Sequence, residues 1–221
     1  VNLSLSEGHK VHAVYRTNSD ELNSLKEKYS KNLKLFKVDF SIKSDVEKLL
    51  NDIDAQKEEI DSYIGLAAVR DNIEYKNINY VDLIKHFKVN VIPNVLIVRS
   101  LGKIMCQNKW GRIVIGSSIG VKFGGGKYSY CYSLTKYASE LIPSIAKKWA
   151  KNNVLYNVVR IGVTDTKIMQ NNGENKLRKR AEMIPMKRPA SPAEIANLVY
   201  WLSSDQNTYI TGETLSISGG E

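Results

Sequence analysis

The segment GRIVIGSS, residues 111 to 118, is a short run of β-branched residues that ends in two serines. Short apolar runs of this kind recur along the chain and are separated by longer segments with helical spacing. The predicted strands are KVHAVY (10–15), LKLFKV (33–38), SYIGLA (62–67), RIVIGS (112–117), LYNVVR (155–160) and TLSIS (214–218). Strands that alternate with helices are typical of a parallel sheet with crossover helices. We therefore expect an α/β fold, a Rossmann-like doubly wound parallel sheet with helices on both faces.

Three helical segments are defined well enough to predict. The longest covers 77–108, and a second covers 131–152 with Pro143 in its interior, where proline should kink it. The third is SPAEIANLVYWLSS (191–204), which begins with Ser191 at the N-cap, Pro192 at the first position and Glu194 completing a capping box. No repeat or low-complexity linker interrupts the 221 residues, so we expect one domain, 1–221.

Composition excludes several classes of protein. Hydrophobic residues make up 43% and charged residues 25%, and no run approaches the roughly 20 apolar residues of a membrane span. Two cysteines, Cys106 and Cys131, without a CxxC motif, and only three histidines argue against a metal cluster or a disulfide framework. The net charge of +9 comes mostly from scattered lysines, which does not indicate a nucleic-acid binder. We expect a cytoplasmic protein that is not bound to a membrane or to nucleic acid.

Polar residues follow several of the predicted strands. Arg16 and Asp39 follow the first two, Ser117 and Ser118 end the fourth, and 162–166 follow the fifth. The carboxyl ends of parallel strands share one edge of a sheet, and ligands bind at that edge. Each of these residue types also fills turns and caps, so the binding and the structural interpretations both stay open for any one of them.

The segment GGGKYSYCYSLTKYASE (124–140) holds four tyrosines in ten positions. Residues four apart lie on one face of a helix, about one turn from each other. Of the twelve tyrosines in the chain, Tyr132 is the one with lysine four residues on, at Lys136. A cation beside a phenol can support proton transfer, but one such pair is also expected by chance in a chain rich in both residues.

With its context, this pair resembles the short-chain dehydrogenase/reductase family, which includes the 3-oxoacyl-carrier-protein reductases. The resemblance rests on GRIVIGSS before YSLTK, VNV around Asn90, GVTDT (162–166) and the ending RPASPAEIANLVYWLSSDQNTYITGETLSISGG. These motifs stand in family order over nearly the whole chain. The resemblance implies an NAD(P)-dependent oxidoreductase that interconverts a carbonyl and an alcohol by hydride transfer.

The resemblance also implies a role for each of four residues. Tyr132 would be the general acid or base, and Lys136 would lower the pKa of its phenol. Ser118 would hydrogen-bond the substrate oxygen, whereas strand alternation points Ser117 to the opposite face. Asn90 would hold a water that links Lys136 to solvent.

The cofactor assignments follow from the same resemblance. Asp39 would accept a hydrogen bond from the adenine amino group, with Phe40 beside it. Arg16 stands where members that prefer NAD usually carry an acidic residue, and a cation there suits a 2′-phosphate, so NADP is expected and NAD is the alternative. The other implied cofactor contacts are Ala67, Tyr132, Lys136, Gly162, Thr164 and Thr166.

The sequence departs from the family pattern at its start and after the third strand. The first strand and the glycine-rich turn that binds the pyrophosphate are missing, so we expect a truncated version of a longer protein or, alternatively, a rearranged sheet that no longer binds the cofactor. GLAA (65–68) replaces the family's NNAG and removes its asparagine side chains. Ile161 replaces the proline that usually precedes Gly162.

Residues 167–188 fall where the family keeps its variable substrate lid. The segment is basic, which favours an anionic substrate such as a 3-oxoacyl thioester or a nucleotide-linked sugar, although a solvated helix face explains single cations equally well. The cations are Lys176, Arg178, Lys179, Arg180, Lys187 and Arg188. The resemblance further implies a homodimer or homotetramer. The rival hypothesis is a non-catalytic relative that serves as a binding or assembly protein.

Overall fold

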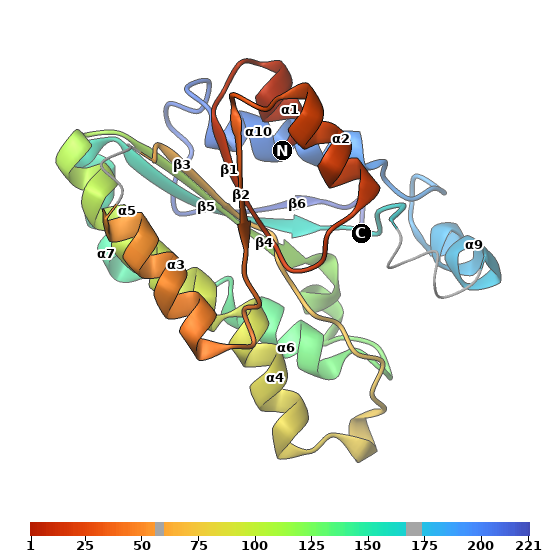
Figure 1. Cartoon of the computed structure of the whole chain (residues 1–221). Coiled ribbons are helices and arrows are strands. Elements are labelled where there is room, and N and C mark those ends of the chain that lie inside the picture. The colour runs from red at the N-terminus through yellow and green to blue at the C-terminus, as the bar shows by residue number, and fades with distance from the viewer. Residues whose placement is uncertain (56–59, 167–173) are drawn as a thin grey trace. The chain divides into compact units, whose positions relative to one another are not determined.

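The computed structural model describes residues 1–55, 60–166 and 174–221, and the chain divides into two compact units, Val1–Glu58 and Glu59–Glu221 (Figure 1). The first unit holds α1 (Asn2–Ser6), β1 (Val11–Tyr15), α2 (Asp20–Lys28), β2 (Leu33–Lys37) and α3 (Lys43–Ala55). The second holds β3 (Ser62–Gly65), α4 (Tyr80–Asn90), α5 (Ile92–Asn108), β4 (Gly111–Ser118), α6 (Tyr130–Ala138), α7 (Ser144–Trp149), β5 (Val154–Ile161), α9 (Glu174–Met183), α10 (Pro192–Ser203) and β6 (Thr214–Ile217). Short 3₁₀ turns at Tyr75–Asn77, Ile119–Phe123 and Ala150–Asn152 connect some of these elements.

The first unit is a parallel β-α-β motif. β1 and β2 pair in register from Val11 opposite Leu33 to Tyr15 opposite Lys37. Leu5, Ala13 and Leu33 form its buried core. α2 begins at the N-cap Ser19, whose side chain accepts a hydrogen bond from the Leu22 backbone N–H.

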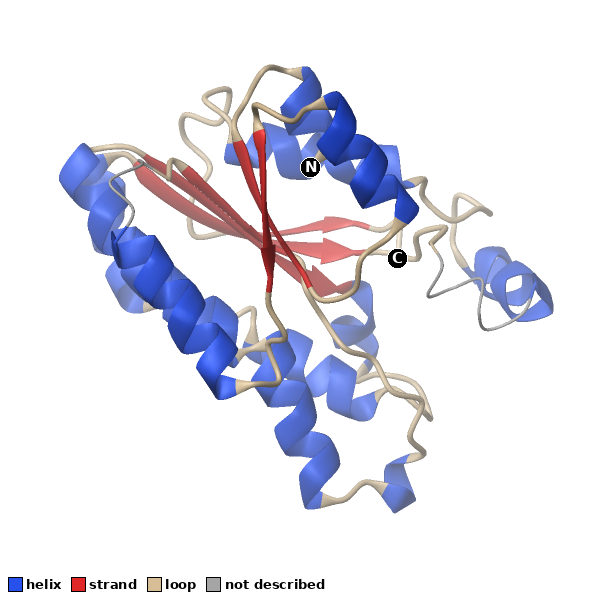
Figure 2. Ribbon diagram, in the orientation of Figure 1, coloured by secondary structure: helices blue, strands red, loops and turns tan. Residues whose placement is uncertain are grey.

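The second unit is built on a four-stranded parallel sheet in the order β3-β4-β5-β6 (Figure 2). α10 packs against one face of the sheet, where Val114 and Val159 meet Ile195, Val199 and Leu202. Because side chains alternate along a strand, the neighbours of Val114 in β4 face the other side, where α5, α6 and α7 pack. The sheet therefore has helices on both faces, which confirms the predicted fold class.

All six predicted strands are present, with ends that shift by one or two residues. The described strands form two sheets, one of β1 and β2 and the other of β3, β4, β5 and β6. No described strand pairs with both sheets. The predicted capping box of α10 is also confirmed: the Ser191 side chain accepts from the Glu194 N–H, and the Glu194 carboxylate accepts from the Ser191 N–H.

Two segments that were each predicted to form one helix form two helices instead, and a proline lies near each break. The segment 77–108 divides into α4 and α5 at Val91, two residues before Pro93. The segment 131–152 is not one kinked helix, because α6 ends at Ala138 and α7 begins after Pro143. Proline lacks the N–H that a helix interior needs and its ring collides with the preceding turn, so it is tolerated only at the start of a helix.

The helical segment Tyr80–Asn108 is long and apolar enough to cross a membrane by length and composition alone. The core helix of a globular domain meets the same criterion. Here Ile97, Leu101 and Met105 are buried, and α5 packs on β3 and β4. These buried apolar residues of α5 therefore belong to the core of the second unit.

Candidate active site

The end of β4 brings three of the predicted catalytic residues together. Ser118, the last residue of β4, caps the following 3₁₀ turn by accepting a hydrogen bond from the Gly120 N–H at 3.2 Å. Ser118 lies near Tyr132, and its side chain favours the ionised form of the Tyr132 hydroxyl. Lys136 lies one turn along α6, with its Nζ 5.8 Å from the centre of the Tyr132 ring. The serine, the tyrosine and the lysine thus form one cluster, at the edge of the sheet where the strands end.

Burial controls the proton affinity of Tyr132. The pKa of its hydroxyl is raised by desolvation, which outweighs the lowering by Ser118 and by the charge of Arg70. Lys136 is not among the causes of this shift. The lowering of the Tyr132 pKa by Lys136 therefore stays a prediction. A protonated tyrosine at neutral pH is nevertheless the form that a general acid requires.

Lys136, the cation of the cluster, is deeply buried. Its side chain is 3% exposed, and its Nζ donates a hydrogen bond to the Gly116 carbonyl oxygen at 2.7 Å. Desolvation lowers its pKa to about 8. An ammonium has three N–H donors and this is its one hydrogen bond among the described residues, so donor capacity remains for a ligand.

Asn90 is fully buried and links three segments behind the cluster. Its Nδ2 donates to the Thr135 hydroxyl at 2.8 Å and to the Val69 carbonyl at 3.1 Å, and its Oδ1 accepts from the Val69 N–H at 2.7 Å. Thr135 precedes Lys136 in α6, so Asn90 fixes α6 to the segment that follows β3. This positioning role is visible in the structure, whereas the predicted water contact stays a prediction.

Asn94, which the sequence analysis missed, fills the space left by the sequence GLAA. A Cβ on Gly65 would lie 2.3 Å from the Asn94 Oδ1. The Asn94 Nδ2 donates to the Asn90 carbonyl at 3.0 Å, and its Oδ1 accepts from the Tyr63 hydroxyl at 2.7 Å. An amide from α5 thus braces β3, where the family pattern uses an asparagine of its own strand. The available signal was its position, four residues after Asn90 in a helix.

Ser117 faces away from the cluster, as strand alternation predicts. Its hydroxyl donates to the Glu140 carboxylate at 2.6 Å, and Arg160 makes two hydrogen bonds to the same carboxylate, at 2.7 and 2.6 Å. Arg160 stands opposite Ser117 in the register of β4 and β5. This ion pair joins the turn after α6 to the two central strands and is structural.

Arg70 is a second residue that the sequence analysis missed. Its guanidinium carbon lies 5.8 Å from the centre of the Tyr132 ring, and the side chain is exposed. Its charge favours the ionised form of Tyr132. No sequence motif pointed to it, because the loop between β3 and α4 has no regular spacing.

Comparison with known proteins identifies the family. A family model described as "Enoyl-(Acyl carrier protein) reductase" matches residues 2–221. The chain belongs to the short-chain dehydrogenase/reductase family. Members of this family are NAD(P)-dependent oxidoreductases, so the predicted enzyme class is confirmed at that level.

This short-chain dehydrogenase/reductase is similar to several known proteins in sequence or in fold. The chain is 33% identical over 181 residues to the 3-oxoacyl-[acyl-carrier-protein] reductase FabG of Aquifex aeolicus (strain VF5), covering 81% of this chain and 71% of that protein. It is 31% identical over 162 residues to the acetoacetyl-CoA reductase of Acinetobacter sp. (strain RA3849), covering 73% and 65%. A solved structure of a 3-oxoacyl (acyl-carrier-protein) reductase from Agrobacterium tumefaciens C58 with NADP bound superposes with a TM-score of 0.83 at 23% identity, covering 96% and 84%.

The residues predicted to hold the nicotinamide end follow β5 at the same edge of the sheet as Ser118. A Cβ on Gly162 would lie 2.6 Å from the Ser218 Cα, so this glycine is required by the approach of the segment after β6. The Thr164 hydroxyl donates to the Gly162 carbonyl at 3.1 Å, and the Thr166 hydroxyl donates to the Thr164 carbonyl at 3.4 Å. These bonds shape the turn. The contact of these residues with the nicotinamide end of the cofactor stays a prediction.

The residues predicted to hold the adenine end belong to the first unit. Asp39 accepts hydrogen bonds from the Ser41 N–H at 2.8 Å and the Ser41 hydroxyl at 2.7 Å. These bonds, more than the nearby charge of Arg16, lower the pKa of Asp39. Asp39 therefore has the turn role that the sequence left open, and one carboxylate oxygen remains for a ligand. Arg16 is exposed, and Phe40 is half-buried.

The predicted lid is only partly described, because 167–173 and the side chain of Lys176 lie outside the described residues. Three of its arginines have acidic partners in the part that is described: Arg178 with Glu182, Arg180 with Glu221 and Arg188 with Glu194. The Lys187 Nζ donates to the Glu182 carbonyl at 2.9 Å. Much of the basic charge of this segment is therefore compensated locally, which weakens the argument from charge for an anionic substrate.

Proposed function

We propose that this short-chain dehydrogenase/reductase uses NADPH to reduce a ketone carbonyl, with Tyr132 as the general acid. The observation that carries the proposal is the cluster of Ser118, Tyr132 and Lys136, in which Ser118 is near enough to lower the pKa of Tyr132 and the Lys136 Nζ lies 5.8 Å from the centre of the Tyr132 ring. Two adjacent hydroxyl donors can bind one carbonyl oxygen. The raised pKa of Tyr132 keeps its proton in place at neutral pH.

The residues of the chain act on the substrate oxygen. The nicotinamide supplies a hydride when the cofactor is bound. As negative charge develops on the carbonyl oxygen, Tyr132 donates its proton to it and Ser118 stabilises it by a hydrogen bond. Lys136, charged below its pKa of about 8, stabilises the tyrosinate that is left. Asn90 holds α6 in place through Thr135.

The preference for NADPH over NADH rests on Arg16. An exposed guanidinium after β1 can bind a 2′-phosphate through two N–H donors. The NADP-bound reductase from Agrobacterium tumefaciens supports the same choice. NADH remains the alternative cofactor, and comparing the KM values of the two cofactors decides between them.

The substrate that we propose is a 3-oxoacyl thioester. Both curated relatives are named for substrates of this kind, one on a carrier protein and one on coenzyme A. Arg70, beside the Tyr132 ring, is the cation best placed to contact an anionic group on such a substrate. The nucleotide-linked sugar considered from the sequence has no support of this kind.

The direct experiment follows NADPH oxidation with acetoacetyl-CoA as substrate. We expect Tyr132→Phe to abolish turnover while the affinity for NADPH stays within about twofold, because one hydroxyl is lost and the ring remains. Tyr137→Phe is the matched control, since Tyr137 lies in the same helix and is 65% exposed. Retained turnover in Tyr132→Phe would remove this residue from the proposed role.

A second arm of the experiment tests the bond that is reduced. Crotonyl-CoA offers a carbon–carbon double bond in place of the ketone, and the description of the matching family model makes this comparison necessary. We expect no NADPH oxidation with crotonyl-CoA. Failure of the protein to bind NADPH at all would instead support the non-catalytic binding or assembly protein.

The assembly state and the compartment are also proposals. We propose a homodimer or homotetramer and a cytoplasmic location. The chain exposes several large apolar side chains on the helical face of the second unit, including Val95, Tyr137, Leu141 and Ile145. Light scattering on the purified protein measures the number of copies directly.

A further inference from the structure

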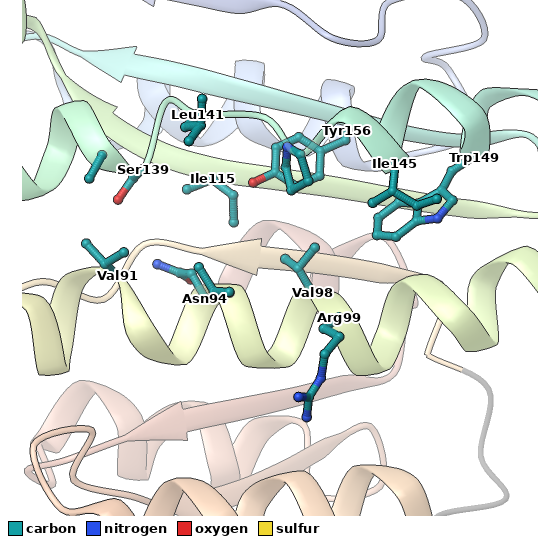
Figure 3. A pocket seen from close by; sticks show the side chains of 13 residues that line it. Val91, Asn94, Val98, Arg99, Ile115, Ser139, Leu141, Ile145, Trp149 and Tyr156 are labelled. Atoms are coloured by element: carbon teal, nitrogen blue, oxygen red, sulfur yellow. The ribbon is translucent and has the colours of Figure 1, made fainter.

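An apolar hollow lies between α5 and the segment that joins α6 to α7 (Figure 3). Leu141 and Ile145, which line it, belong to the exposed apolar face that we propose for subunit contact. Figure 3 shows the Arg99 side chain turned away from the hollow. The hollow is therefore part of the proposed subunit contact rather than a separate ligand site.

A buried ion pair lies elsewhere in the second unit, between α9 and the residues that follow β6. The Glu221 side chain is 6% exposed, and its partner is Arg180 of α9, whose side chain is 27% exposed. The Arg180 Nη2 donates a hydrogen bond to the Glu221 Oε1. The proposed reaction uses neither residue, so this buried pair needs another explanation.

The pair makes one of the two hydrogen bonds that its groups allow. Arginine and carboxylate groups frequently bind each other through two parallel N–H···O bonds. Here the Arg180 Nη1 and the Glu221 Oε2 are buried and have no hydrogen-bond partner among the described residues. Buried polar atoms without a partner are rare and destabilise a fold. A contact that keeps two of them is better explained by a role in positioning α9 than by stability alone.

Glu221 is also bonded to the turn that follows the catalytic serine. Lys122 lies in the 3₁₀ turn Ile119–Phe123, which Ser118 caps, and its Nζ donates to the main-chain oxygen of Glu221 at 2.9 Å. The Ser218 hydroxyl donates to the same oxygen at 3.2 Å. Glu221 thus contacts α9 through its side chain and this turn, the catalytic turn, through its main chain.

The residues around Glu221 also hold the segment that follows α9. The Met186 N–H donates to the Gly219 carbonyl oxygen at 3.1 Å, and a Cβ on Gly219 would lie 2.9 Å from the Ile184 side chain. In the part of the chain that the structure describes, no helix or strand packs broadly on α9. The position of α9 therefore depends strongly on its contact with Glu221.

We propose that Glu221 is a positioning residue that couples α9 of the predicted lid to the catalytic turn and thereby sets the affinity for the substrate. Its side chain anchors α9 through Arg180, and its main chain is held by Lys122. Met183 and Met186 are 73% and 58% exposed, so the anchored segment presents apolar side chains suited to an acyl chain. The effect on the substrate rests on the proposed reductase function, whereas the anchor does not.

Hydrogen exchange measured by mass spectrometry tests the anchor without any substrate. Glu221→Gln keeps the shape of the side chain and removes its charge. The amides of 178–183 should exchange about fivefold faster or more in this variant, because a neutral hydrogen bond replaces a charged one. Glu182→Gln is the matched control: it removes the charge of the exposed pair Arg178–Glu182 in the same helix and should stay within about twofold. Unchanged exchange in Glu221→Gln would overturn the anchor.

A double-mutant cycle tests whether the two residues act through each other. Arg180→Gln leaves a buried carboxylate without its cation, and Glu221→Gln leaves the arginine without its anion. The double variant removes both charges, so its α9 amides should exchange no faster than those of the more affected single variant. Effects on the free energy of opening that simply add in the double variant would contradict the pairing.

The link to the catalytic turn has a test of its own. Lys122→Met removes the hydrogen bond to the main-chain oxygen of Glu221 and should raise exchange in 178–183 by about twofold or more, the size of one exposed hydrogen bond. Lys127→Met is the control, because Lys127 is paired with Glu74 instead. Exchange in α9 that responds to Glu221→Gln and not to Lys122→Met would refute the coupling to the turn.

Steady-state kinetics tests the effect on the substrate. Glu221→Gln should raise the KM for acetoacetyl-CoA by about fivefold, while kcat and the KM for NADPH stay within about twofold. A purely structural defect would lower the amount of active protein, and so kcat, without raising this KM. An unchanged KM in a variant with faster exchange in α9 would overturn the role in substrate affinity. A wild-type protein without turnover would refute the proposed reductase instead, and hydrogen exchange would still decide on the anchor.

Discussion

Replacing Lys136 by methionine should abolish activity without lowering stability at neutral pH. Methionine has a similar length, but it removes the ammonium that the buried site must desolvate. The pKa of Lys136 is about 8 against an ordinary 10.5. Each pKa unit corresponds to about 1.36 kcal/mol, so the charged form destabilises the fold by roughly 3 kcal/mol below pH 8.

The methionine variant also loses one hydrogen bond. The Gly116 carbonyl, which accepts from the Lys136 Nζ at 2.7 Å, is left without this donor. A buried acceptor without a partner destabilises by about 1–3 kcal/mol. The two effects oppose each other. At pH 7 we therefore expect the free energy of unfolding of Lys136→Met to exceed that of the wild type by roughly 0–2 kcal/mol.

The sign of the pH dependence follows from linkage. Between pH 8 and 10.5 the unfolded chain binds the lysine proton and the folded chain does not, so the wild type gains stability as the pH rises through this window. Methionine does not titrate. The difference in the free energy of unfolding between variant and wild type should therefore shift by roughly 3 kcal/mol in favour of the wild type. The wild type should become the more stable protein near pH 10.5.

Urea unfolding followed by tryptophan fluorescence measures this difference, because all three tryptophans lie in the second unit. Lys103→Met is the control, since Lys103 is exposed on α5 and should show no change of this kind. The free energy of unfolding of each variant is subtracted from that of the wild type at the same pH, which cancels the titration of all other groups. A stability difference for Lys136→Met that stays constant from pH 7 to 10.5 would refute the assignment of Lys136 as a buried, pKa-shifted cation.

Three further substitutions test other parts of the reasoning. Gly65→Ala should destabilise the protein by roughly 1–3 kcal/mol in the same urea assay, because its methyl group would collide with the Asn94 amide at 2.3 Å. Arg70→Ala should raise the KM for acetoacetyl-CoA more than it lowers kcat and shift the alkaline limit of the rate profile upward, since its charge favours ionised Tyr132; an unchanged pH profile would contradict this. Arg16→Leu should raise the KM for NADPH by about tenfold or more and leave that for NADH within about twofold, and equal effects on both would exclude a 2′-phosphate contact.

The sequence predicted the positions of the six strands along the chain because these depend on local pattern. β-branched runs with polar ends appear in six places, and the structure has a strand at each. The capping box at Ser191 was equally visible, since its three residues are adjacent in the chain. The pairing of Tyr132 with Lys136 needed only the geometry of one helical turn. Proline at positions 93 and 143 divided the helices more completely than the apolar spacing suggested.

What the sequence by itself determined is therefore the fold class, the family and the candidate catalytic residues, because these rest on residue patterns along the chain. The tertiary structure decided the electrical state of those residues and the residues that support them. Burial is the largest cause of the raised pKa of Tyr132, and Arg70 and Asn94 reach the site from a loop and a helix that no motif connects to it. Desolvation depends on every atom packed around a group, which is why no pattern of neighbours along the chain could reveal it.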